Sequence, residues 1–257
     1  MKRLLTFSVF CVALAIAPLA HAQVVIPTSF ANVEGNSGGE GTSLGVFSNS
    51  AQIVYNESLL TAAGLNVGDV LTGLSFRLNA VDSAPIWSVN DYIIRLSTSN
   101  FSAGNLVGDF AANRGTDFTE VRNGALSYDG TEYDTSSTAP STGPGVPNAF
   151  GPSITFNQGT FTYNGGDLLL EYTHSNIDLS QNAPGVQEVA RADAVTGFAG
   201  VQSSFSPGFN TTDGLAFGGF GNEFAPIVQF DVTSVPEPTS AVLLMGLGLV
   251  GVVRRRR

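Results

Sequence analysis

The sequence is poor in the residues on which reactive and metal-binding sites depend. Its only cysteine is Cys11, inside an apolar N-terminal run, and its two histidines are His21 and His174. A zinc site needs several Cys or His ligands and a thiolate nucleophile needs cysteine, so neither is expected in the body of the chain, residues 23–234. Disulfide bonds are excluded from that body for the same reason.

Positive charge is also scarce. The body contains no lysine, and its twenty acidic residues face only five arginines: Arg77, Arg95, Arg114, Arg122 and Arg191. Binding to nucleic acid or to an anionic membrane surface needs cationic patches, so the composition of the body argues against both functions. The composition indicates an acidic extracytoplasmic domain that is rich in turns. It is also compatible with weak affinity for divalent cations.

The N-terminus has the three parts of a secretory signal peptide. Lys2 and Arg3 provide the charge, residues 4–19 are mostly apolar, and Ala20-His21-Ala22 is a small-x-small cleavage site. We therefore predict a signal peptide over residues 1–22, with Gln23 as the new N-terminus after cleavage. The chain is expected to be exported across the cytoplasmic membrane.

The C-terminal tail, residues 235–257, has a proline-stiffened segment, an apolar run and a basic cluster. The run Ala241–Val253 makes a helix of about 20 Å, shorter than the hydrocarbon thickness of about 30 Å. Basic flanks stay on the cytoplasmic side, so the arginines act as a stop-transfer signal. The basic residues are Arg254, Arg255, Arg256 and Arg257, and the stiff segment is Val235, Pro236, Glu237 and Pro238.

This tail resembles the PEP-CTERM sorting domain of Gram-negative bacteria, which is also labelled the ice-binding protein C-terminal domain. The resemblance covers about a tenth of the chain, and the family of the body is not recognised. It implies recognition of Pro236-Glu237-Pro238 by an exosortase, a membrane protease or transpeptidase, in the inner membrane. The precursor would be anchored there and would then reach the cell surface or the medium. The alternative is a single-span anchor that is never cut.

The body reads as about ten short strands with little helix. Strands with period-two alternation are predicted at 70–79, 92–98, 167–174 and 226–232, and shorter ones elsewhere, including 187–194 and 215–217. A hairpin is predicted at Asn123-Gly124, a helical turn or two at 57–63, and a long loop at 131–152. We predict an all-β fold, a β-sandwich of jelly-roll type.

Few residues of the body are candidates for catalysis or metal binding. His174 ends a predicted strand with no nucleophile motif nearby, which favours an anchoring role at the surface or in a loop over a catalytic triad. Paired carboxylates for glycoside hydrolysis cannot be picked out among so many acids. The turn 129–134 carries Asp129, Glu132 and Asp134, oxygen ligands that suit calcium, although the spacing is not that of an EF-hand and a solvated turn is the commoner reading.

Three functions remain open from these observations. The first is a non-enzymatic surface or biofilm-matrix protein. The second is a carbohydrate-binding module, with or without a stabilising calcium ion, for which Trp87 and four tyrosines are candidate platforms: Tyr92, Tyr128, Tyr133 and Tyr163. Exopolysaccharide is named as the ligand only because the resemblance to PEP-CTERM proteins implies it. Trp87 could equally fill the core. A secreted hydrolase is the third and weakest. Ice binding would need a regular Thr-rich array, which the sequence lacks.

Overall fold

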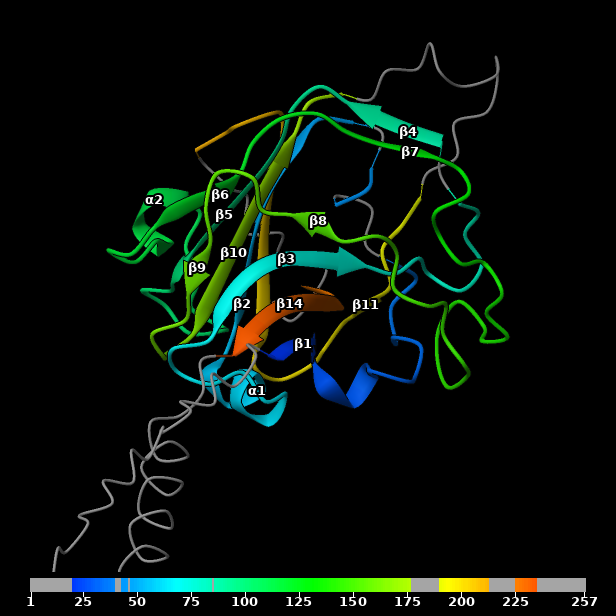
Figure 1. The fold of residues 1–257 in the computed structure, drawn as a ribbon, viewed down its shortest axis with the longest axis horizontal. Helices are drawn as coiled ribbons and strands as arrows, with labels where there is room; N and C mark the ends of the chain where they lie inside the picture. The colour runs from blue at the N-terminus through cyan, green and yellow to red at the C-terminus, as the bar shows by residue number, and fades with distance from the viewer. Residues whose placement is uncertain are drawn as a thin grey trace, which may run out of the picture. The chain divides into compact units, whose positions relative to one another are not determined.

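A computed structural model describes residues 20–39, 43–45, 47–84, 86–176, 190–212 and 225–234. In this part the chain forms mainly β-strands, with two short helices, α1 (Glu57–Ala62) and α2 (Phe110–Asn113), and one 3-10 helix, η1 (Thr28–Phe30). The all-β prediction is therefore confirmed for the described residues (Figure 1). The jelly-roll type stays a prediction.

The strands form two large sheets and two small ribbons. The β14 sheet has the order β1-β14-β3-β8, with β9 also paired to β3; its strands are β1 (Ala20–Ile26), β14 (Val228–Ser234), β3 (Val70–Phe76), β8 (Ile154–Thr155) and β9 (Phe161–Thr162). The β10 sheet has the order β12-β2-β10-β5-β6; its strands are β12 (Val201–Pro207), β2 (Asn49–Tyr55), β10 (Leu168–His174), β5 (Tyr92–Thr98) and β6 (Thr119–Arg122). The ribbons pair β4 (Ile86–Val89) with β7 (Leu126–Asp129), and β11 (Ala194–Val195) with β13 (Ala225–Pro226).

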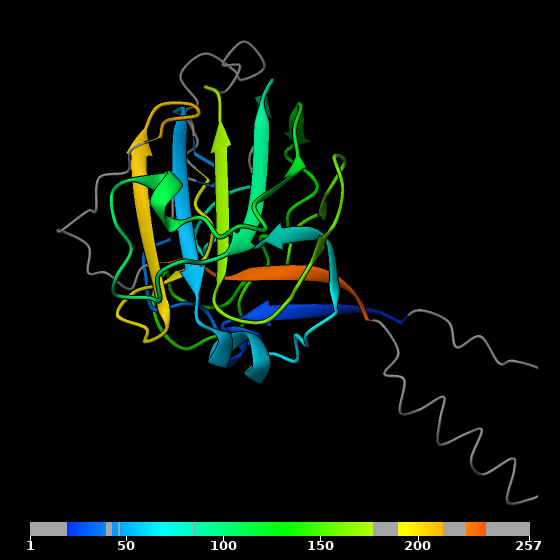
Figure 2. The ribbon, with the colours of Figure 1, turned by 90° about the vertical axis from the view of Figure 1, so that its left-hand side faces the viewer.

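The two large sheets share one hydrophobic core. Because successive side chains of a strand point to opposite faces, each sheet contributes alternate residues to it. Leu170 and Tyr172 enter from the β10 sheet, and Phe76 and Phe230 from the β14 sheet. The rings of Phe76 and Tyr172 meet edge to face with centroids 6.2 Å apart. In Figure 2 the strands of the two sheets run across one another.

The outer face of the β10 sheet is covered as well. On this face Val54 and Leu169 pack against Leu106, with Phe101 and Ala103 beside them. The segment 99–118, which connects β5 to β6, therefore forms a second small core with the sheet. All seven residues of β10 and of β2 are buried as a result. Burial on both faces explains why β10 begins with a continuous apolar run.

One local prediction is wrong. Asn123-Gly124 does not close a hairpin, because β6 pairs with β5 while β7 pairs with β4. The chain instead passes from a large sheet to a ribbon at this point, and the Gly124 carbonyl accepts a hydrogen bond from the Tyr92 amide at 2.9 Å. The dipeptide does form a tight local bend, since Gly124 has φ +131, but long-range pairing decides where the flanking strands go.

The other predicted elements divide into confirmed ones and ones outside the described residues. The helix predicted at 57–63 is α1, and the alternation predicted at 226–232 is present in β14, where Val228, Phe230 and Val232 face the core. The loop predicted at 131–152 contains neither helix nor strand. The strand predicted at 215–217 and residues 187–189 of the one predicted at 187–194 lie outside the described residues; within 190–194 only an isolated bridge at Ala192 and the first residue of β11 are extended and paired. The apolar segment 241–253 also lies outside the described residues, and the described helices include none with the length and hydrophobicity to span a membrane.

Candidate functional site

The predicted signal-cleavage triplet lies on the edge strand β1. His21 and Ala22 are exposed, and the Nδ1 atom of His21 lies 3.4 Å from the Thr233 hydroxyl of β14. Two residues further on, the side-chain Nε2 of Gln23 donates to the Asp231 carboxylate at 3.5 Å. As numbers rise along β1 they fall along β14, so the two strands are antiparallel. The start of β1 and the end of β14 therefore meet at one corner of the sheet (Figure 2).

A shallow hollow of about 460 Å³ opens at this corner, lined by His21, Ala22, Gln23, Thr72, Asp231 and Val232. Asp231 is held in place there because its carboxylate also accepts a hydrogen bond from the Ser153 hydroxyl. The predicted sorting residues Val235, Pro236, Glu237 and Pro238 and the cluster Arg254, Arg255, Arg256 and Arg257 lie outside the described residues. The structure thus places the point where the sorting tail departs, at Ser234, beside the predicted cleavage site.

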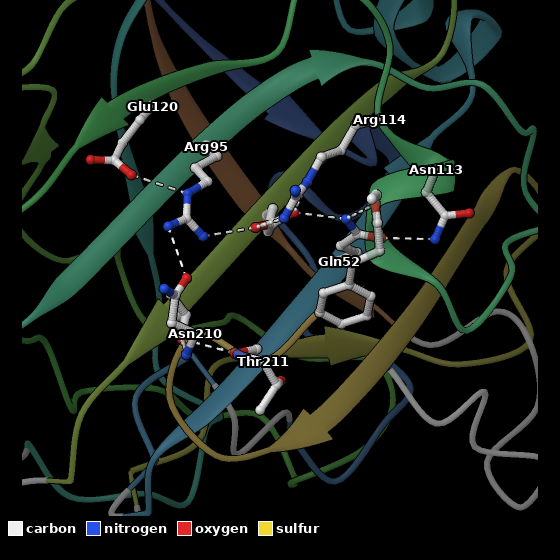
Figure 3. Close-up of polar contacts among 12 residues, drawn as sticks. Gln52, Arg95, Asn113, Arg114, Glu120, Asn210 and Thr211 are labelled. Carbon is white, nitrogen blue, oxygen red and sulfur yellow. Dashed lines mark hydrogen bonds and ion pairs between the residues drawn. The ribbon is translucent and has the colours of Figure 1, made fainter. Parts of the chain in front are cut away.

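A row of polar side chains crosses the outer face of the β10 sheet. The strand register sets Ser204 opposite Gln52, Gln52 opposite Glu171, Glu171 opposite Arg95, and Arg95 opposite Glu120. This polar row therefore spans all five strands. From Gln52 to Glu120, neighbours along the row are bonded: Gln52 donates to Glu171 at 2.7 Å, and Arg95 donates to Glu171 at 2.9 Å and to Glu120 at 3.1 Å (Figure 3).

The segment containing α2 supplies a second cation to the polar row. Arg114 donates hydrogen bonds to both carboxylate oxygens of Glu171, at 2.9 and 2.8 Å, and its guanidinium lies over the Phe118 ring. Asn113 donates to the Gln52 side chain at 2.8 Å, so helix and sheet are joined through amides as well as charges (Figure 3). Asp109 caps α2 by accepting from the Ala111 amide.

Within the polar row the charges balance. Glu171 is almost fully buried and is neutralised by two guanidinium groups, one of which also binds Glu120. A buried charge is tolerated only when paired and hydrogen-bonded, and here both conditions hold. The arrangement suits a structural clamp between the sheet and α2.

A second buried charge cluster lies beyond the end of β3 and consists of Arg77, Asp193 and Glu34. Arg77 donates to Asp193 at 2.7 Å and also to the carbonyl groups of Phe30, Ala31 and Val33 near η1. Arg77, Asp193 and Glu34 are at most 1% exposed. Asp193 additionally accepts from the Gly35 amide at 2.9 Å, which ties the 34–39 loop to the segment before β11.

Glu34 is the least satisfied member of this second cluster. Its Oε1 atom accepts from the Ala80 amide at 2.8 Å, but its Oε2 atom is buried without a hydrogen-bond partner, as is the Oδ1 atom of Asn79. Burial, followed by the negative charge of Asp193, raises the pKa of Glu34 from 4.5 to about 7. The Ala80 amide and Arg77 oppose that rise. Near neutral pH this carboxyl group therefore carries a proton part of the time.

The acidic turn uses its carboxylates locally. Glu132 accepts from the Asp129 amide at 2.8 Å, Asp129 accepts from the Thr131 hydroxyl at 2.6 Å, and Asp134 accepts from the Ala149 amide at 2.9 Å. Hydrogen bonds from Thr131 lower the pKa of Asp129, and the Ala149 amide lowers that of Asp134. In the part of the chain that is described, no three acidic, His or Cys side chains gather as metal ligands. Calcium binding by this turn stays a prediction.

His174 and the aromatic residues belong to the core. His174 is fully buried, stacks on Tyr92 with centroids 5.8 Å apart, and has its Nε2 atom 3.0 Å from the Asn49 amide nitrogen. The expected position at the surface or in a loop is thus wrong, because the adjoining ribbon covers this strand end. Trp87 is 2% exposed and stacks on Tyr128, so it fills the core. The remaining candidate platforms, Tyr92, Tyr133 and Tyr163, are also buried.

Sequence reasoning did not find either charge cluster. A signal was present, since Arg77, Arg95 and Glu171 are charged residues within predicted strands that are rich in apolar residues. Alternation places such residues on the face opposite the core, and the simplest expectation for that face is solvent. The structure shows instead that all five arginines of the body donate hydrogen bonds within the chain.

Comparison with known proteins identifies the tail. Residues 234–257 match the family described as PEP-CTERM protein-sorting motif. The resemblance drawn from the residues is therefore confirmed for this segment, and no curated protein matches the chain. A PEP-CTERM motif implies export, a membrane-anchored precursor and an exosortase partner in the membrane.

Proposed function

We propose that the chain is a non-enzymatic protein of the cell surface or extracellular matrix of a Gram-negative bacterium. A signal peptide cleaved after Ala22 directs export, the tail holds the precursor in the inner membrane, and an exosortase cuts at Pro236-Glu237-Pro238. The observation that carries the proposal is the sorting motif at 234–257, which begins at the last residue of β14. The folded body, of jelly-roll type, is then the cargo that this signal delivers.

The described body supports a binding or structural role over an enzymatic one. Its buried histidine stacks in the core, and Glu171, its most strongly paired buried carboxylate, is held between arginines. A general base must instead reach a substrate proton. The carbohydrate-binding alternative has less support, because Trp87 and the four tyrosines proposed as stacking platforms for sugars are buried.

Substitution of the motif tests the proposal. With Pro236, Glu237 and Pro238 changed to alanine, we expect full-length protein in the membrane fraction, whereas the native chain loses its arginine tail. Blotting with an epitope in the body and mass measurement of the C-terminus distinguish the two. A matched control changes Thr239 and Ser240 to alanine in the same segment and should be processed normally. An identical fragment pattern for the native and motif-substituted chains would refute exosortase cleavage.

A further inference from the structure

We propose that Asn164 is a site of covalent modification: it loses its side-chain amide by cyclisation onto the Gly165 nitrogen, whereas the fold protects the same dipeptide at Asn123-Gly124. The sequence contains these two Asn-Gly pairs. Glycine favours the cyclisation because it has no side chain to hinder the approach of its nitrogen. The two pairs are therefore chemically alike, and what distinguishes them is the structure around each. The inference does not depend on the proposed sorting.

The reaction needs only water as a co-reactant. The Gly165 nitrogen attacks the Cγ atom of Asn164, the bond from Cγ to Nδ2 breaks, and the amide leaves as ammonia, which takes up the proton that the Gly165 nitrogen loses to solvent. Water then adds to one of the two carbonyl carbons of the succinimide ring. The product is aspartate, or isoaspartate, in which the main chain passes through Cγ. The first step needs a side chain that can turn toward the next nitrogen, and a nitrogen that is free.

Four hydrogen bonds hold Asn123-Gly124 in place. The Asn123 amide donates to the Asn157 side chain, and the Asn123 carbonyl accepts from the same side chain, each at 3.0 Å. The Asn123 side chain donates to Glu120 at 2.8 Å, and the Gly124 carbonyl accepts from the Tyr92 amide at 2.9 Å. Cyclisation must break the bond to Glu120 and turn a stretch of main chain that is bonded on either side. It therefore proceeds only through a local opening of this bend.

The Asn164-Gly165 pair is not held in this way. It lies in the turn between β9 and β10, and Asn164 is exposed. Among the described residues, none forms a hydrogen bond with the Asn164 side chain or with the Gly165 amide nitrogen. Gly165 has φ +93, a conformation that favours glycine, so the turn itself requires the residue that makes the pair reactive. Both conditions for cyclisation are thus met at Asn164 and not at Asn123.

The modification changes a turn that already carries acidic neighbours. The Gly166 amide donates to Glu57 at 3.1 Å, and Asp167 accepts from the Glu57 amide at 2.8 Å, so the turn holds the first residue of α1. A carboxylate at position 164 adds another negative charge to this group, and like charges repel. Isoaspartate also lengthens the main chain shortly before the buried strand β10. We expect the modified chain to unfold at a lower temperature than the unmodified one.

Peptide mapping of the full-length chain, held in detergent and incubated in warm, mildly alkaline buffer made with heavy-oxygen water, tests the inference. Each conversion leaves a heavy oxygen atom at the modified residue, and fragmentation distinguishes aspartate from isoaspartate. We expect Asn164 to be converted at least about tenfold faster than Asn123 in the folded chain, and the two at similar rates in urea. The melting temperature should fall as conversion proceeds, whereas an Asn164→Gln variant should keep its melting temperature during the same incubation.

The protection of Asn123 is tested separately with Asn157→Ala, which removes two of the four bonds at an exposed position. We expect conversion of Asn123 to rise about tenfold in this variant, and not in the matched control Gln158→Ala, which changes the next exposed residue. An unchanged rate in Asn157→Ala would contradict protection by these bonds. Equal conversion of Asn123 and Asn164 in the folded chain, or an Asn164 that is converted only in urea, would overturn the inference.

Discussion

The two buried charge clusters are built from the same groups but in opposite proportions. In the polar row of the β10 sheet, one buried carboxylate, Glu171, is shared by two guanidinium groups. In the cluster beyond β3, one guanidinium group, Arg77, faces two buried carboxyl groups, Asp193 and Glu34. The first cluster is neutral once Glu120 is included, and the second carries an excess negative charge whenever Glu34 is ionised.

This difference determines how each cluster responds to its surroundings. A carboxyl group that is buried beside another carboxyl group can lower its free energy by taking up a proton, as the raised pKa of Glu34 beside Asp193 indicates. Arg77 also has no route to water, while the side chains of Arg95 and Arg114 are 12% and 22% exposed. The cluster beyond β3 should therefore be both more costly to break and more sensitive to pH.

The largest effect is expected from Arg77→Met. The change leaves Asp193 as an uncompensated buried charge and removes the donor of three backbone carbonyl groups, so we expect a loss of about 3–5 kcal/mol in the free energy of unfolding. Urea denaturation of the purified mature chain measures it. Adding Asp193→Asn should restore at least about 1 kcal/mol of that loss. A loss below about 1 kcal/mol for the single variant would contradict a buried ion pair here.

Glu34→Gln should stabilise the protein above pH 7. Because the folded-state pKa of Glu34 is raised from 4.5 to about 7, the folded chain binds more protons within this window, and native stability falls as the pH rises through it. The variant lacks this pH-dependent contribution. We therefore expect its free energy of unfolding to exceed that of the native protein by about 3 kcal/mol above pH 7 and to equal it near pH 4. Unfolding curves between pH 4 and 8 test this, and a constant difference across the range would refute it.

Glu171→Gln should lower the free energy of unfolding by less than Arg77→Met does. The variant leaves Arg95 and Arg114 without their shared partner, but both can turn toward water and Arg95 keeps Glu120. We expect a loss of about 2 kcal/mol, measured by the same denaturation. If this variant proved as costly as Arg77→Met, the solvent access of the two arginines would not be what distinguishes the clusters.

The smallest effect is expected from Glu120→Gln. The Glu120 side chain is 36% exposed, and Arg95 retains its bonds to Glu171 and Asn210. Exposed ion pairs contribute little and are screened by salt, so we expect at most about 1 kcal/mol at low ionic strength and less at high. A loss that did not change with salt would place Glu120 in the buried part of the row.

Alternation in the sequence predicted much of the fold. The alternating patterns predicted the strands β5, β10 and β14, and for β14 also the face that packs on the core; α1 was predicted from a short helical run. Partners could not be predicted in the same way. Asn123-Gly124 has the local preference of a hairpin, but the strands on either side pair with β5 and β4, which is a long-range choice that no local pattern records.

Export and sorting could be inferred from the amino-acid sequence alone, because such signals are read as linear peptides whose residues suffice without a fold. The pairing of charges depends on the tertiary structure, since Arg77 meets Asp193, and Arg95 meets Glu171, across more than seventy residues of chain. The tertiary structure likewise decided that Trp87 and His174 lie in the core. Burial depends on what covers a strand, and in this protein the cover comes from distant segments.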